Sequence, residues 1–260
     1  MNEIQIVFQK RALLLIFLSI LFAINIGKAQ YAQFIGEGTI IFKKRINLDA
    51  LIKKRFYDKN DYITNKLITD YKASYPSSFR TIEYSLNFNK DRSIYSRLTN
   101  RTADEDLRIG EVEGCDNIIL TDFKKKKLDI NLPVSGQHFF ISDTLPKIVW
   151  KITNEVRDIA GFSCRRANGL MMDSLYVVAF FTPQIPVPSG PEIANGLPGM
   201  ILGLAVPSLH TTWFASSVQS KSINNAPHAR NEGKKIIRLD EYVKEISSNL
   251  MNWQIQQSLL

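Results

Sequence analysis

Apolar and polar residues alternate along most of this chain, a pattern typical of β-strands with one buried and one solvated face. The clearest example has apolar residues at Ile82, Tyr84, Leu86 and Phe88, with polar residues between them. Residues 89–92 have turn-forming side chains, and an extended pattern resumes over residues 93–98. The two segments therefore predict a β-hairpin.

Similar extended segments recur at short spacing through the rest of the chain. They lie at residues 33–45, 117–123, 128–132, 138–142, 147–153, 161–167, 175–182, 200–205 and 210–219. Turns, not long helices, separate them, which favours antiparallel pairing over βαβ units. The sequence therefore predicts a mainly β (α+β) fold, an antiparallel curved sheet or half-barrel of about ten strands.

Two segments have helical periodicity and predict one or two helices that cover the sheet. The first spans residues 61–72, with apolar positions at Ile63, Leu67, Ile68 and Tyr71. The second spans residues 240–257, with a stripe of Tyr242, Val243, Ile246, Leu250 and Trp253. Asp240 and Glu241 stand at the start of the second helix, where its dipole favours negative charge.

The first 29 residues have the pattern of a cleaved signal peptide. Lys10 and Arg11 precede an apolar run over residues 12–26, which is shorter than the roughly twenty residues of a spanning helix. Small residues in the triplet 27–29 predict cleavage after Ala29, with an uncleaved membrane anchor as the alternative. Residues 30–260 are then a single β-rich domain, and the chain is expected to be exported to the periplasm or cell envelope.

Charge and cysteine content narrow the classes of partner only slightly. Loss of residues 1–29 lowers the formal net charge from +8 to +6, which does not indicate a nucleic-acid-binding protein. The lysine run 124–127 either ends a solvated hairpin or forms a docking patch. An oxidising compartment permits a disulfide between Cys115 and Cys164, although each is equally compatible with a buried thiol.

Residues 181–204 are rich in proline and glycine and predict a constrained backbone. Proline fixes φ near −65° and biases the preceding residue towards extended geometry, so we expect a stiff, polyproline-like arm. Pro198 and Gly199 suit a type II turn before a strand that enters the core. The arm either closes the sheet or frames a ligand mouth or docking edge.

These residues also carry a family resemblance. The motif residues are Phe181, Thr182, Pro183, Ile185, Pro186, Gly190, Pro191, Gly196, Leu197, Pro198 and Gly199. Together with residues 150–152, 159–162, 164–167 and the hairpin at 84–95, they resemble the GLPGLI family of Bacteroidetes envelope proteins, with Met200 where the family name has leucine. Residues 47–78 match that family poorly.

The resemblance implies export and one β-rich domain, but it implies no activity because the family has none established. The resemblance also implies a fold similar to the half-barrel of periplasmic lipoprotein carriers. That similarity is one of fold and does not assign a function.

The sequence contains no local pattern of a hydrolase, a zinc site or a phosphate-binding loop, so no catalytic residue, metal ligand or cofactor is predicted. His210 is a loop histidine or, as the alternative, a catalytic base. We therefore expect a non-enzymatic protein that binds an apolar or extended ligand, either lipid or peptide. The alternative is an accessory interaction protein for an outer-membrane transport or assembly system; the ligand and partner themselves are unknown.

Overall fold

The computed structural model describes residues 34–55, 61–74, 77–98, 116–134, 137–172, 174–221, 235–246 and 259–260. All of them belong to one compact unit, Phe34–Leu260. The predicted signal peptide lies outside the described residues, so its cleavage remains a prediction.

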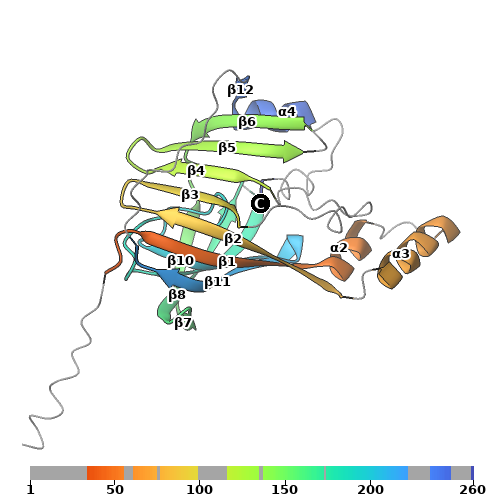
Figure 1. The fold of residues 1–260 in the computed structure, drawn as a ribbon, viewed down its shortest axis with the longest axis horizontal. Helices are drawn as coiled ribbons and strands as arrows, with labels where there is room; N and C mark the ends of the chain where they lie inside the picture. The colour runs from red at the N-terminus through yellow and green to blue at the C-terminus, as the bar shows by residue number, and fades with distance from the viewer. Residues whose placement is uncertain are drawn as a thin grey trace, which may run out of the picture. The chain divides into compact units, whose positions relative to one another are not determined.

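The described chain is built around one curved β-sheet (Figure 1). In chain order its strands are β1 (Gly38–Asn47), β2 (Phe79–Phe88), β3 (Arg92–Arg97), β4 (Ile118–Asp122), β5 (Lys127–Val134), β6 (Gln137–Thr144), β7 (Val149–Ile159), β8 (Phe162–Met171), β9 (Leu175–Thr182), β10 (Met200–Val206), β11 (Thr211–Gln219) and β12 (Ile236–Ile237). The expectation of about ten strands was too low, because the sheet has twelve. Strand β12 has only two residues, too few to produce a visible alternation.

Two antiparallel meanders form this sheet, in the order β12-β6-β5-β4-β3-β2-β1-β11-β10-β9-β8-β7. Strands β1 to β6 make the first meander and β7 to β11 the second, and antiparallel pairing of β1 with β11 joins them. Phe42 at this junction lies opposite both Ala215 and Tyr84. Among the described strands, β12 alone pairs in parallel, with β6. Strand β7 ends the order and is an edge strand.

One face of the sheet, called the inner face, packs against the core, and the opposite face is called the outer face. The predicted alternation in β2 is confirmed: Ile82, Tyr84, Leu86 and Phe88 are all buried. The same period places Ile40, Phe42, Lys44 and Ile46 of β1 on the inner face. Each apolar side chain of this kind contributes roughly 1.5–3 kcal/mol by leaving water.

Part of the outer face is covered by the far end of β7. The register of β7 against β8 shifts between Ile152 and Val156. Beyond this irregularity the Arg157 guanidinium lies over the rings of Phe180 and Phe214. The Ile159 side chain lies close to Gly203 of β10. Both faces of β10 are therefore covered, which explains its continuous apolar sequence.

Three α-helices lie within the described residues: α2 (Leu48–Arg55), α3 (Tyr62–Ser74) and α4 (Leu239–Ile246). The sequence reading missed α2, which follows β1 directly. Asn47 caps it by accepting a hydrogen bond from the Ala50 amide at 3.1 Å. Helix α2 buries Leu48, Leu51 and Ile52 against the core.

The two predicted helices form, but their apolar faces differ from the expectation. In α3, Ile63 is exposed and Ile68 only partly buried, so the expected covering face was wrong at Ile63. Helix α4 buries Tyr242 and Ile246, and the Tyr242 ring packs edge-on against Phe139 of β6. The remainder of the predicted terminal helix lies outside the described residues.

The segment between β9 and β10, residues 183–199, is here called the arm. Ile185, Val187 and Leu197 are buried by the core, whereas Pro183 and Pro186 are exposed. The arm is not a simple polyproline helix, which would have no internal hydrogen bonds. Amides bond the carbonyl two residues earlier in three places: Val187 to Ile185, Ser189 to Val187, and Gly199 to Leu197, each at 2.8 Å.

These three-residue turns, each centred on a proline, satisfy backbone groups that burial would otherwise leave unpaired. The turn at Pro198 is therefore tighter than the expected type II turn, although Gly199 has the positive φ that such a turn requires.

Candidate functional site

The described residues that the sequence suggested as candidates for chemistry, His210 and Cys164, do not form a common site in the structure. His210 is exposed in the loop between β10 and β11, where it follows a 3₁₀ turn, η2 (Pro207–Leu209), with a left-handed backbone. Partial burial and the charge of Lys54 lower its pKa. Within the described residues, no group of three or more histidine, cysteine or acidic side chains is arranged to hold a metal ion.

Cys164 of β8 is a buried thiol, and burial raises its pKa to about 12. A thiol with so high a pKa is a poor nucleophile at neutral pH. Cys115, its predicted partner, lies outside the described residues, so the disulfide remains a prediction.

The motif residues of the arm contribute mainly to packing. Phe181 and Thr182 end β9 and are buried, as are Gly190 and Pro191. An added Cβ at Gly190 would lie 2.8 Å from the Ile201 Cβ, so only glycine fits between arm and strand. Gly196 and Pro198 are exposed. Burial of most of the arm supports the interpretation that it closes the core.

The arm also carries a buried charge, Glu192, whose side chain meets Lys44 of β1. The Lys44 ammonium lies 3.3 Å from Glu192 Oε1, and both side chains are at most 2 % exposed. The Trp213 indole of β11 donates to the same oxygen at 3.2 Å. Lys44 also donates to the main-chain oxygen of Leu260. We call Lys44, Glu192, Trp213 and Tyr95 the core polar cluster.

Aromatic rings complete the surroundings of the Lys44 ammonium. It lies 5.1 Å from the centroid of Trp213 and 5.7 Å from that of Tyr84. Tyr84 stacks on Tyr95 of β3 with a centroid separation of 4.9 Å. Ring faces attract a cation, most strongly where water is excluded, so the site suits a charged lysine.

The Glu192 carboxylate has fewer hydrogen-bond donors than its two oxygens can accept. Both donors converge on Oε1, whereas among the described residues Oε2 accepts no hydrogen bond of good geometry. The nearby Tyr95 hydroxyl interacts only weakly with the carboxylate and lowers its pKa slightly. Burial raises the pKa of Glu192 to about 7, and the opposing effects of Lys44 and Trp213 only partly offset it. Burial likewise raises the pKa of Tyr95, with a further contribution from the Glu192 charge.

The core polar cluster therefore has the perturbed groups of an active site, but each of its four residues is at most 2 % exposed. Its members come from β1, β3, β11 and the arm, and Lys44 and Glu192 are 148 positions apart. We interpret the cluster as the contact that holds the arm to the sheet. Sequence reasoning missed it, although one signal was present: the period of β1 places Lys44 among apolar inner-face residues.

The other unusual feature is an exposed apolar surface on and beside β7, here called the β7 apolar edge. Val149 is 72 % exposed at one end of β7. Val156, 56 % exposed, lies opposite Arg165 beyond the register shift and so on the other face of the strand. Val149 lies opposite Leu170 of β8, and Leu170 lies opposite Tyr176 of β9. Leu170 is 50 % exposed and Tyr176 is 45 % exposed. An apolar row thus crosses three strands at the sheet edge.

Fold and site together define a class: a β-sheet protein with a proline-rich crossover packed in its core and an exposed apolar edge strand. Within the described residues, no helix is long and apolar enough to cross a membrane.

Residues 170–203 match the model of a family described as "Protein of unknown function (Porph_ging)". The match contains β9, the arm and Glu192, but not the other members of the core polar cluster. No curated protein matches the chain.

Solved structures of PNGF-II resemble the fold. The structure in the P21 space group has a TM-score of 0.51 at 12 % identity, covering 82 % of this chain and 33 % of that one. The structure in the C2 space group has a TM-score of 0.49 at 14 % identity, covering 85 % and 33 %. This chain therefore matches about a third of the length of PNGF-II.

Proposed function

We propose that this chain is an exported envelope protein that binds an extended, apolar polypeptide segment along β7 and performs no catalysis. The observation that carries the proposal is the β7 apolar edge. An edge strand has unpaired backbone groups, and an incoming strand can pair with them while its side chains cover exposed apolar residues.

The inner face is a weaker candidate for the ligand. Ile185, Val187 and Leu197 of the arm already occupy the core on that side. A lipid held there would have to displace these side chains and the Glu192 contact with Lys44. A peptide on β7 requires neither change.

Export rests on the signal-like pattern of residues 1–29 and on the resemblance to the GLPGLI family. The family of unknown function whose model matches residues 170–203 is consistent with that resemblance. In PNGF-II the matched region is one third of the chain, so there a sheet of this type is part of a larger protein.

A more specific form of this function is an accessory role in an outer-membrane transport or assembly system. The same edge strand favours it, because strand addition joins whole proteins as readily as it captures peptides.

Charge introduced at the edge tests the proposal. The double variant Val149→Lys and Val156→Lys should weaken binding to an extended-peptide library by at least about tenfold, since covering an unpaired ammonium costs more than about 1.4 kcal/mol. Tyr62→Lys with Ile63→Lys, at exposed apolar positions of α3, is the matched control and should bind normally. Binding is measured by fluorescence anisotropy.

A photo-crosslinker at Tyr176, used in whole envelopes, separates the two forms of the proposal. Crosslinks to a recurrent membrane protein support the accessory role, and crosslinks to varied peptides support general capture. Equal binding by the β7 and α3 variants would disprove the proposed site.

A further inference from the structure

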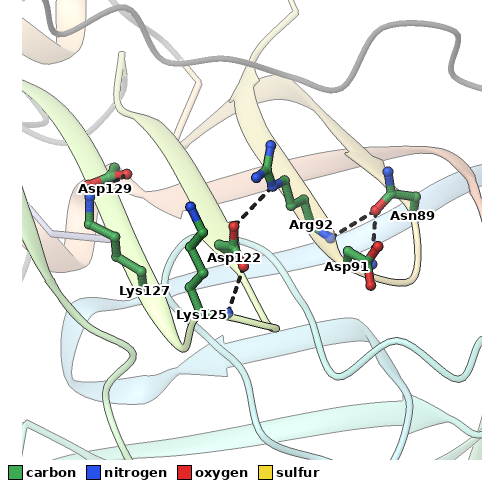
Figure 2. Close-up of polar contacts among 7 residues, drawn as sticks. All are labelled: Asn89, Asp91, Arg92, Asp122, Lys125, Lys127 and Asp129. Atoms are coloured by element: carbon green, nitrogen blue, oxygen red, sulfur yellow. Dashed lines mark hydrogen bonds and ion pairs between the residues drawn. The ribbon is translucent and has the colours of Figure 1, made fainter.

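Two lysine-bearing turns lie side by side at one end of the first meander (Figure 2). The first joins β2 to β3 at residues 89–91, and the second joins β4 to β5 at residues 123–126. Strands β3 and β4 are paired, with Arg92 opposite Asp122. The Phe123 amide donates to the Asp91 carbonyl at 2.9 Å and ties the two turns together.

Side-chain hydrogen bonds hold both turns in shape. The Asn89 side-chain oxygen accepts from the amides of Asp91 and Arg92, at 2.9 and 2.8 Å. Asp122 accepts from the Lys125 amide at 2.8 Å. Such local bonds stabilise tight turns, so the lysines are carried on an ordered support.

The nearby carboxylates are largely neutralised within this support. Asp122 pairs with the Arg92 Nε at 3.0 Å, and Asp129 pairs with the Lys127 ammonium at 3.1 Å (Figure 2). The remaining cations are Lys90, Lys124, Lys125 and Lys126, all exposed. Among the described residues, none of their ammonium groups makes an ion pair.

We propose that this surface, called the lysine turns and comprising Lys90, Lys124, Lys125 and Lys126, docks the protein on a membrane of anionic lipid headgroups. Asp91, in the first turn, is exposed and makes no ion pair with any of the residues that the structure describes. The site is separate from the β7 apolar edge and does not depend on the function proposed for it.

Lysine side chains favour an anionic lipid surface as the ligand over a single anion bound in a pocket of fixed shape. The arginine of the cluster, whose planar fork would suit a bidentate site, is already engaged by Asp122. The free groups are ammonium ions on flexible stems, which adapt to an array of headgroups. Basic residues near an anionic bilayer each strengthen binding about fivefold, and salt screens the effect.

The test is sedimentation of the purified chain with vesicles of phosphatidylglycerol and phosphatidylcholine. The triple variant Lys90→Gln, Lys124→Gln and Lys126→Gln should lose about 100-fold in partitioning to phosphatidylglycerol-rich vesicles. Lys53→Gln, Lys66→Gln and Lys235→Gln, exposed lysines elsewhere, remove the same charge and should lose far less. Raising salt from about 0.05 to about 0.5 M should abolish the difference.

Three outcomes would overturn the proposal. One is equal binding to vesicles with and without phosphatidylglycerol, and another is equal loss in both triple variants. The third is binding to soluble dextran sulfate without binding to vesicles, which would assign the turns to a polysaccharide.

Discussion

At the scale of single residues, Lys44 and its neighbour Lys43 show how position decides the meaning of a side chain. The two are adjacent, yet Lys43 faces solvent and pairs with Glu83 at 3.7 Å, whereas Lys44 is buried against Glu192. A surface pair contributes little because water and salt screen it. A buried charge that loses its partner costs several kcal/mol.

Lys44→Met should therefore lower the free energy of unfolding at pH 8 by about 3 kcal/mol, because Glu192 would stay buried without a cation. Lys43→Met, the control, should change it by less than about 1 kcal/mol. Urea unfolding followed by tryptophan fluorescence measures both. Adding Glu192→Gln to Lys44→Met should restore part of the loss, and failure of both expectations would show that the core polar cluster does not stabilise the arm.

At the scale of elements, the arm is the segment where sequence and structure are most informative together. Its prolines and glycines correctly indicated constraint, and its junction with β10 depends on Gly199. This residue has φ of +145°, and an added Cβ would lie 2.1 Å from the Thr182 carbonyl oxygen. Backbone cannot move away as a flexible side chain can, so the junction tolerates no larger residue.

Gly199→Ala should therefore destabilise the protein by more than about 3 kcal/mol, from backbone strain together with the steric clash. Gly161→Ala is the matched control: its φ is +85°, but nothing lies within 4 Å of an added Cβ. This control should cost only about 1–2 kcal/mol. Thermal unfolding by circular dichroism measures both, and equal losses would argue against the clash.

The helices show the opposite relation between sequence and structure. Helix α2 begins with an Asn47 cap and an acidic first turn, signals that were visible in the sequence but were overlooked beside the strand pattern. Helix α3 was expected to cover the core, and its exposed Ile63 shows that helical periodicity alone does not identify which face meets a neighbour.

At the scale of the described chain, the sheet is continuous only because β1 pairs with β11 across the two meanders. The core polar cluster spans this junction, with Lys44 on β1 and Trp213 directly opposite on β11. Protonation of Glu192 should consequently affect the unfolding of the whole sheet and not only the arm.

Stability should fall as pH rises from about 4.5 to about 7. In this window the unfolded Glu192 has released its proton while the folded protein, with a pKa of about 7, retains it. The folded state then binds more protons, so the free energy of unfolding decreases, by up to about 3 kcal/mol, and levels off above pH 7. The pKa values of Asp49, Asp122 and Asp143 are lowered in the folded protein, so these groups change the free energy of unfolding only at pH values below this window.

Urea midpoints at pH 5 and pH 7.5 measure this slope. Glu192→Gln removes this titration and should be close in stability to the parent protein at pH 5. Its stability should lose the downward slope and retain only a small opposite one from His210, whose lowered pKa favours folding as pH rises towards 6.5. A parent protein that gains stability over this range, or a variant with the same slope, would contradict the assignment.

Local sequence determined the strands, their solvent-exposed and buried faces, the hairpin turns and the constrained arm. Each of these features depends on residues within a few positions of one another. The exposed lysine run was likewise visible as the end of a hairpin. These features follow from backbone sterics and from the period of burial.

Only the tertiary structure decided the strand order, the exposed β7 edge, the contact of Lys44 with Glu192 and the contact between the turns at residues 89–91 and 123–126. Each depends on which distant segments pack together, and that outcome reflects summed burial and pairing over the whole sheet. No short stretch of sequence contains that information.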